Sequence, residues 1–157
     1  MKVETWFIGK TADAYLEEGM NKYAKKLPHY IPFEQVVIPD VKNGGKLSVI
    51  QLKKKEAELV LKKLKPQDGL ILLDEKGKQM TSEILATWMD SQLQMPYRRL
   101  IFLVGGAFGF DQQLYQRANG KLSLSLMTFS HQMVRLFLLE QLYRAMTILR
   151  NEPYHNR

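Results

Sequence analysis

Residues 100–109 read Leu-Ile-Phe-Leu-Val-Gly-Gly-Ala-Phe-Gly, an apolar run followed at once by a glycine-rich segment. The run 100–104 has no polar alternation, so a strand formed there is buried on both faces, which is typical of a mainly parallel sheet. Residues 70–73, Leu-Ile-Leu-Leu, repeat this pattern. Glycines let the backbone approach a ligand, and ligands of such sheets bind beyond the carboxyl ends of the strands. The segment 105–109 is therefore either a ligand loop or a tight turn.

The rest of the chain alternates short strand-like runs with amphipathic helical segments. This alternation, with no linker-like stretch, predicts one domain over residues 1–157 with a three-layer α/β/α architecture and a mainly parallel sheet. The expected strands are 3–8, 33–38, 70–73, 100–104 and 121–126, and the expected helices are 12–26, 47–64, 81–93, 111–118 and 132–150. Residues 151–157 form a polar tail.

The composition suits a soluble protein with a polyanionic partner. Lys and Arg number 23 against 16 Asp and Glu, a net charge of +7, which favours nucleic acid as a partner, although many soluble proteins are mildly basic. The lysines of 47–64 are interpreted first as a solvated helix face. The apolar run 3–8 is too short and too alternating for a signal peptide or a membrane span, so we expect a cytoplasmic protein that enters no membrane.

The sequence excludes several kinds of catalytic site. The chain has no cysteine, which removes disulfides, thiolate nucleophiles and cysteine zinc sites. Gly9-Lys10-Thr11 follows a strand, but a phosphate-binding loop needs another glycine where Glu4 stands. The three histidines lie far apart and lack the spacing of metal ligands, so no metal is expected. No G-x-S-x-G elbow is present for acyl transfer.

The final helical segment, 132–150, is apolar around nearly its whole circumference. Such a helix needs cover on more than one side. In a chain this short, the second cover is expected from another subunit. We therefore expect a self-associating protein.

Five segments, taken together, resemble one family. They are Leu72-Leu73-Asp74, residues 104–109, residues 124–135 (Leu-Ser-Leu-Met-Thr-Phe-Ser-His-Gln-Met-Val-Arg), residues 140–145 and residues 153–155. In this combination the chain resembles, over its whole length, the ribosomal RNA large subunit methyltransferase H family, which belongs to the SPOUT class of trefoil-knotted methyltransferases. The run 127–135 and the terminal Tyr154-His155 are the specific parts. Ser130 is a departure, because the family usually has proline before the histidine.

The resemblance implies a fold, a cofactor and a substrate. The fold is SPOUT-like, with a trefoil knot in the C-terminal third, and the protein is a homodimer. The methyl donor is S-adenosyl-L-methionine, and the acceptor is N3 of a pseudouridine in the 23S ribosomal RNA of the large ribosomal subunit. Gly105 is expected to leave room for the cofactor. Carried over by position, the cofactor contacts are Leu73, Gly105, Leu124, Ser125, Leu126, Met127, Thr128 and Phe129.

Four residues near the C-terminus are candidates for the chemistry. His155 is a candidate base for the imide proton, because the ordinary pKa of histidine lies close to neutrality. Tyr154 is expected to position that ring or the uracil. Arg135 and Arg144 are expected to hold phosphate or to stabilise charge on the base, although Glu140 and Arg144 also have the spacing of a simple i,i+4 ion pair. In a knotted dimer, the tail of one chain would complete the cofactor pocket of the other.

Methyl transfer from a sulfonium needs no protein nucleophile. This agrees with the absence of a cysteine and of a G-x-S-x-G elbow from the sequence. Two alternatives stay open. A non-catalytic RNA-binding or ribosome-binding α/β protein would have the same charge but would not need the glycine-rich loop. A different α/β transferase would act on a protein or a small molecule and would have little affinity for ribosomes.

Overall fold

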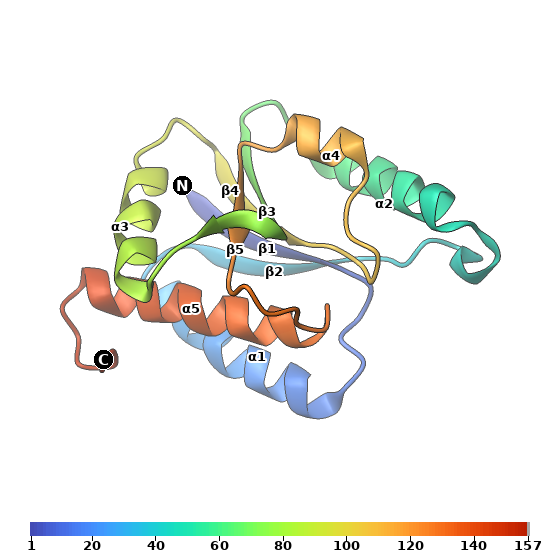
Figure 1. Cartoon of the computed structure of the whole chain (residues 1–157). Helices are drawn as coiled ribbons and strands as arrows, with labels where there is room; N and C mark the ends of the chain where they lie inside the picture. The colour runs from blue at the N-terminus through green and yellow to red at the C-terminus, as the bar shows by residue number, and fades with distance from the viewer. Residues whose placement is uncertain (157) are drawn as a thin grey trace.

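The structure, a computed structural model, describes residues 1–156 and has a five-stranded sheet as its middle layer (Figure 1). The strands lie in the order β2-β1-β4-β3-β5, and every neighbouring pair is parallel. Their bounds are Lys2–Ile8 (β1), Phe33–Ile38 (β2), Asp68–Gln79 (β3), Arg99–Val104 (β4) and Gly120–Ser123 (β5). The helices are Ala14–Lys26 (α1), Val49–Lys63 (α2), Ser82–Leu93 (α3), Gln112–Arg117 (α4) and Met133–Leu149 (α5), with short 3-10 turns at Leu27–His29 (η1) and Gly44–Lys46 (η2). None of the helices that the structure describes is long and apolar enough to span a membrane.

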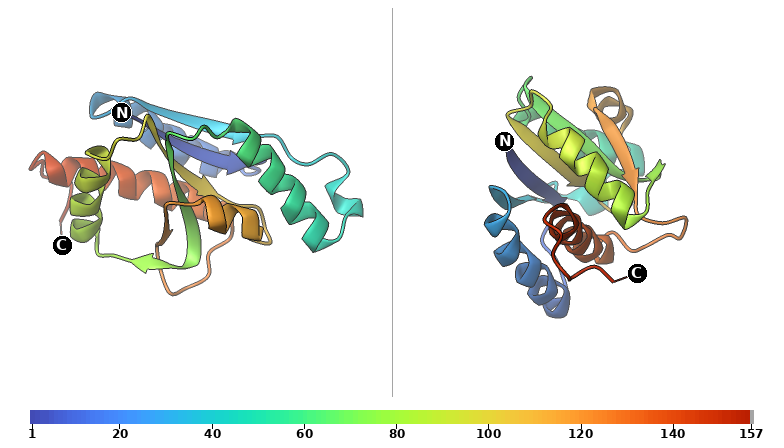
Figure 2. Two further views of the ribbon diagram at one scale, coloured as in Figure 1. Left: turned by 90° about the horizontal axis from the view of Figure 1, so that it is seen from above. Right: turned by 90° about the vertical axis from the view of Figure 1, so that its left-hand side faces the viewer.

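Helices cover both faces of the sheet, which confirms the three-layer prediction. α1, α3 and α5 pack on one face, and α2 and α4 pack on the other (Figures 1 and 2). The central strand β4 is enclosed between the two layers, since the residues from Leu100 to Leu103 are each 0% exposed. An apolar strand without alternation is thus buried on both faces, as the sequence predicts.

The edge of the sheet differs from the sequence prediction. β3 continues to Gln79, beyond the expected end at 73, and pairs with β5 a second time after a shift in register. β5 ends at Ser123 rather than at 126. Ser123 Oγ donates to the carbonyl oxygen of Ser125 at 2.9 Å, and Ser125 Oγ accepts from the Met127 N–H at 3.0 Å. These side-chain hydrogen bonds compete with the ladder bonds of a longer strand, and so they turn the chain out of the sheet.

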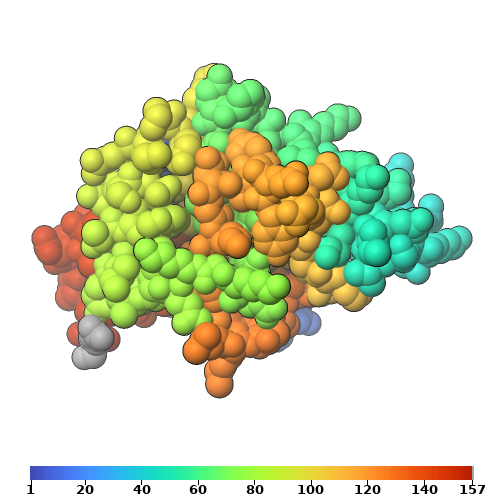
Figure 3. Space-filling view, turned by 45° about the horizontal axis from the view of Figure 1, so that its top comes forward, coloured from blue at the N-terminus to red at the C-terminus, as the bar shows by residue number. Residues whose placement is uncertain are grey.

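The segment after β5 leaves the sheet and leads to α5. In Figure 3 the green extension of β3 crosses the visible face, and the orange chain that contains β5 lies on both sides of it. Between β5 and α5 the chain therefore passes from one side of that extension to the other. The trefoil knot that the resemblance implies concerns this region, and it stays a prediction.

α5 begins and ends with local hydrogen bonds that fix its length. Ser130 Oγ accepts from the Met133 N–H at 3.0 Å, so the serine in place of the family's proline satisfies a free donor at the start of the helix. At the other end, Asn151 adopts a left-handed conformation with a φ of 55°, which ends the helix before the proline of the tail. Glu152 then accepts from the Tyr30 O–H at 2.6 Å, and this bond holds the start of the tail in place.

Candidate functional site

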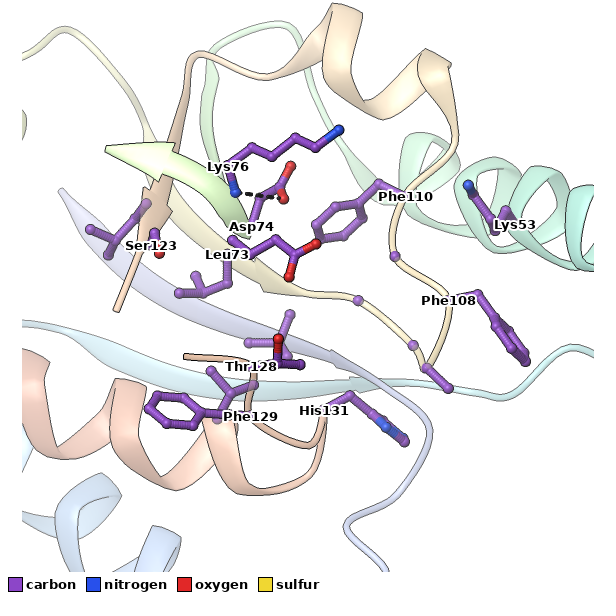
Figure 4. A pocket seen from close by; sticks show the side chains of 18 of the residues that line it. Lys53, Leu73, Asp74, Lys76, Phe108, Phe110, Ser123, Thr128, Phe129 and His131 are labelled. Carbon is purple, nitrogen blue, oxygen red and sulfur yellow. Dashed lines mark hydrogen bonds between the residues drawn. The ribbon is translucent and has the colours of Figure 1, made fainter. Parts of the chain in front are cut away.

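A cavity of about 750 Å³ lies at the carboxyl ends of β3, β4 and β5 (Figure 4). Small-molecule sites commonly have volumes of roughly 300–1,000 Å³. The wall comes mainly from segments at 73–76, 104–112 and 122–129, with further side chains from α2 and α5. Parallel strands bring their carboxyl ends to one edge of the sheet, which is why segments far apart in the sequence meet here.

Seven of the eight predicted cofactor contacts line this cavity: Leu73, Gly105, Leu124, Ser125, Met127, Thr128 and Phe129. In Figure 4 the Thr128 side chain points into the cavity. The eighth residue, Leu126, lies outside the lining, and it is 88% exposed. The turn that follows Ser123 directs the Leu126 side chain toward solvent, and the expected cofactor contact at Leu126 stays a prediction.

The glycine-rich segment 105–109 is both a tight turn and part of the cavity wall. Gly109 has a φ of +83°, and its N–H donates to the Gly106 carbonyl oxygen at 3.3 Å. A Cβ atom at Gly105 would meet the Phe110 ring at 2.8 Å. The expectation that glycine is needed at position 105 only to leave room for the cofactor is therefore corrected. A larger residue at this position would displace Phe110 from the core, instead of simply filling the space of the cofactor.

Asp74, directly after the buried part of β3, is a cavity residue for which the sequence predicted no role of its own. Its Oδ1 accepts from the Lys76 N–H at 3.2 Å, while Oδ2 is buried with no hydrogen-bond partner within residues 1–156. Burial raises the pKa of Tyr115, and the direct interaction of its phenol with the Asp74 carboxylate, followed by the charge of Glu75, adds to the rise, so Tyr115 stays protonated next to Asp74. A buried oxygen without a partner costs free energy, so this carboxylate is suited to a ligand that offers a cation or a donor.

His131 is a second residue of the cavity wall that the sequence did not assign to the site. Burial, and then the Arg135 guanidinium, lower the pKa of His131, while Asp40 opposes the shift. The imidazole is therefore neutral near pH 7. Its position in the sequence, just before an apolar helix, suggested only a capping or core role. It is Ser130, not His131, whose side chain accepts from the first N–H of α5.

Three of the four predicted catalytic residues meet in a separate group, the tail cluster, which consists of Glu83, Glu140, Arg144, Tyr154 and His155. Arg144 Nη1 lies 3.0 Å from His155 Nδ1, and Arg144 Nε donates to Glu140 at 3.0 Å. The i,i+4 ion pair with Glu140 is therefore present. The Tyr154 O–H donates to Glu140 Oε1 at 3.0 Å, and Tyr154 packs edge-on against the ring of Tyr143.

The hydrogen bonds of the tail cluster define the tautomer of His155. A guanidinium has only donors, so Nδ1 accepts from Arg144. The proton then lies on Nε2, which is 3.0 Å from Glu83 Oε1 and donates to it. Both ring nitrogens are engaged, and His155 has no free lone pair in this arrangement. Burial, with Tyr23 and Glu140 as neighbours, raises the pKa of Tyr154, so the phenol also keeps its proton.

Within one chain, the tail cluster and the cavity are separate. No member of the tail cluster lines the cavity. In Figure 1 the C-terminus lies beyond the end of α5, below α3 and away from the loops that follow β4 and β5. Residues 1–156 also contain no group of three or more His, Asp or Glu side chains arranged to hold a metal ion.

Arg135, the fourth predicted catalytic residue, has a different place. It is 0% exposed, and its guanidinium donates to the carbonyl oxygens of Gly9 at 2.8 Å and Ile8 at 2.7 Å. The guanidinium also lies over the Phe7 ring, and burial lowers the pKa of Arg135. The prediction that Arg135 contacts phosphate is therefore wrong for this arrangement. Its side chain is buried and links α5 to the end of β1 by hydrogen bonds.

Comparisons with known proteins give one consistent family. The family described as predicted SPOUT methyltransferase matches residues 1–155. The chain is 54% identical to ribosomal RNA large subunit methyltransferase H of Parabacteroides distasonis over 156 residues, which cover 99% of each protein. It is 54% identical to the protein of the same name from Cytophaga hutchinsonii, over 99% of this chain and 100% of the relative. For the Flavobacterium johnsoniae protein of that name, the identity is 49% over the full length of both.

A solved structure with a weaker similarity is ribosomal RNA small subunit methyltransferase E from Neisseria gonorrhoeae, bound to S-adenosyl methionine. The match has a TM-score of 0.47 and 12% identity, and it covers 94% of this chain and 66% of that one. This similarity is too low to carry a functional argument.

Proposed function

The chain belongs to the SPOUT methyltransferase family, and from this premise we propose that it methylates RNA of the large ribosomal subunit with S-adenosyl-L-methionine as the donor. The observation that carries the proposal is the 54% identity, over 99% of both chains, to a ribosomal RNA large subunit methyltransferase H. The acceptor we propose is N3 of a pseudouridine in 23S ribosomal RNA. The whole chain, 1–157, acts as one methyltransferase domain in the cytoplasm, where the ribosomes are.

The cavity has features that suit S-adenosyl-L-methionine. The donor combines a flat adenosine with a sulfonium and an ammonium, so it needs apolar walls, close backbone approach and negative charge. Phe110 and Phe129 supply apolar walls, and the turns at 105–109 and 123–129 bring backbone to the surface of the cavity. The Asp74 carboxylate supplies a buried oxygen in need of a partner. These residues would hold the donor. The donor would supply an activated methyl group, with a neutral thioether as the leaving group.

The protein's own contribution is alignment, exclusion of water and removal of one proton. Holding acceptor and donor in line can contribute about 7–11 kcal/mol to the barrier reduction. The imide N–H must lose its proton so that its electron pair can form the new N–C bond. His155 can take that proton only when Arg144 leaves its Nδ1. A phosphate of the RNA competes for the guanidinium, and we propose that this competition frees His155 as the substrate binds.

We propose further that the enzyme is a homodimer with shared sites. The tail cluster and the cavity are both needed for this chemistry, yet they lie apart in one chain. Apolar side chains are exposed on the segment after β5 and on α5: Leu126 at 88%, Met127 at 75% and Phe137 at 37%. A second copy that covers this surface would bury them and bring its tail toward the cavity. These exposures support the earlier expectation that α5 needs a partner.

The experiment that tests the proposal uses ribosomes from a strain that lacks the gene. Mass mapping of their 23S ribosomal RNA should reveal one missing methyl group on a pseudouridine, and the purified protein with labelled donor should restore it. Ribosomes that lack the pseudouridine should be poor acceptors, because a pocket that pairs with the extra N1–H of pseudouridine leaves a partner unsatisfied with uridine, at a cost of about 1–3 kcal/mol. A protein that binds ribosomes but not the donor in calorimetry would instead be the non-catalytic binding protein.

A further inference from the structure

Phe108 is an exposed aromatic residue in a constrained loop. It lies between Ala107 and Gly109 in the glycine-rich turn, and it is 55% exposed. Gly106 and Gly109 form an isolated bridge, so the turn presents the ring from a closed backbone loop. Phe110 and Phe129 each pack against another ring, whereas Phe108 has no aromatic partner within residues 1–156. One part of Phe108 lines the cavity while the rest faces solvent.

Two lysines line the same cavity from different elements. Lys53 comes from the second turn of α2, and Lys76 comes from the extension of β3 (Figure 4). Neither lysine forms an ion pair within residues 1–156. The capping box of Ser48 and Gln51 fixes the start of α2, so the position of Lys53 is set by the fold. Both ammonium groups are therefore available to an anion at the mouth of the cavity.

Two carboxylates of the cavity wall, those of Asp74 and Asp111, each accept one hydrogen bond from the backbone. Asp74 accepts from the Lys76 N–H through Oδ1, and Asp111 accepts from the Gln113 N–H at the start of α4. In Figure 4, Lys53 and Phe108 lie toward the end of the cavity opposite Ser123. This end combines an exposed aromatic face with the unpaired Lys53 ammonium, while Lys76 lies beside Asp74, nearer to Ser123. Proteins bind single-stranded RNA with the same combination, since bases stack on aromatic rings and phosphates contact lysines.

We propose that Phe108, Lys53 and Lys76 form a subsite for the RNA strand next to the methylated nucleotide. An unstacked neighbouring base lies on the Phe108 ring, and the flanking phosphates contact the two lysines. The subsite rests on the proposed function, and it adds the residues that hold the acceptor strand. It is independent of base identity, because every base has a face that stacks. The adenine of the donor is the competing occupant of the Phe108 ring, and the experiment separates the two.

The experiment measures two affinities for each variant: for S-adenosyl-L-methionine by calorimetry, and for ribosomes from the gene-deleted strain at several potassium chloride concentrations. Phe108→Ala should weaken ribosome binding by about 5- to 150-fold, with donor affinity and salt dependence unchanged. Phe108→Trp should retain binding. Lys53→Gln and Lys76→Gln should each reduce the slope of log affinity against log salt by about 0.7. Lys25→Gln, on α1 at the other face of the sheet, is the matched control and should leave the slope unchanged.

Two outcomes would overturn the subsite. Weaker donor binding with unchanged ribosome binding in Phe108→Ala would assign the ring to the adenine. If the Lys53, Lys76 and Lys25 variants all change the salt slope equally, the two cavity lysines contribute only general surface charge and form no subsite. A failure of the proposed function looks different, because the unaltered protein would then bind the donor yet fail to methylate the ribosomes at all.

Discussion

The cavity and the tail cluster are built in opposite ways. Around the cavity several polar groups lack partners within residues 1–156: one Asp74 oxygen is buried without a bond, and Lys53 and Lys76 have no ion pair. In the tail cluster the polar groups are linked, from Glu83 through His155 and Arg144 to Glu140 and Tyr154. A surface that binds a ligand keeps groups free for it, whereas a group that acts on a ligand is best oriented in advance. We therefore assign binding to the cavity and orientation to the tail.

The sharpest test of this division mixes two inactive chains. One chain lacks the tail from Tyr154 onward, and the other carries Thr128→Trp, which puts a large ring into the cavity from an exposed position. Each variant alone should lose methylation. A mixed dimer contains one pocket with an intact wall and an intact partner tail, so verified mixed dimers should recover about half of the normal activity. The recovery is read from labelled methyl groups on ribosomes.

Both parent chains must remain folded and dimeric, which circular dichroism and light scattering establish beforehand. If verified mixed dimers stay inactive, the tail acts within its own chain or has no part in the chemistry. The division into a cavity on one subunit and a tail from the other would then be wrong, although the family assignment would be unaffected.

Arg144→Ala is the next largest expected effect. It removes the guanidinium that we propose moves from His155 Nδ1 to an RNA phosphate, and with it the ion pair with Glu140. Loss of an oriented charged group commonly costs about 100-fold or more in kcat. Donor affinity should stay unchanged, since Arg144 is not part of the cavity wall. Arg144→Lys keeps the charge but not the forked geometry, so it should recover only part of the loss. Equal losses of kcat and donor affinity would contradict the separation of the two regions.

The sequence predicts the central layers of this protein well because burial leaves a direct signature. The apolar runs at 70–73 and 100–104 become two of the three inner strands, and the segments 105–109 and 124–129 meet at their carboxyl ends. The chemistry is harder to place. Arg135 sits in an apolar helix and was expected to bind phosphate, yet its partners are carbonyl oxygens more than a hundred positions away. Only the tertiary path of the chain decides whether an arginine faces a ligand or a backbone.

Short-range hydrogen bonds explain the other differences. The apolar pattern of 121–126 predicts a strand to its end, but Ser123 and Ser125 bond to nearby backbone and stop it early. His131 and Asp74 belong to the cavity, although His131 precedes an apolar helix and Asp74 follows an apolar strand, positions that suggested capping or packing. An acid placed directly after a fully apolar strand is the one signal that could have identified Asp74.

Asp74→Asn should weaken binding of S-adenosyl-L-methionine by about 10- to 150-fold, because a hydrogen bond with a charged group is worth roughly 1.5–3 kcal/mol. The change keeps the size of the side chain, so the fold and the affinity for ribosomes should be unaffected. Isothermal calorimetry with the free donor measures the difference. Glu75→Gln, a neighbouring exposed acid on the same wall, is the matched control. If both variants lose affinity equally, general charge explains donor binding better than the buried Asp74 oxygen does.

The smallest expected effect concerns His131 and the pH dependence of stability. Burial and the Arg135 guanidinium hold the pKa of His131 below its ordinary value of 6.5, against a smaller opposing effect of Asp40. The unfolded chain therefore binds a proton at His131 before the folded chain does, and folding stability falls as the pH drops through about 6.5 toward the folded pKa. His131→Gln removes this proton-linked loss. The free energy of unfolding, measured in urea at about pH 7.5 and about pH 5.5, should fall less in the variant than in the unaltered protein. A drop of the same size in both would show that His131 is accessible to protons in the folded state, and would remove it from the partly buried wall of the cavity.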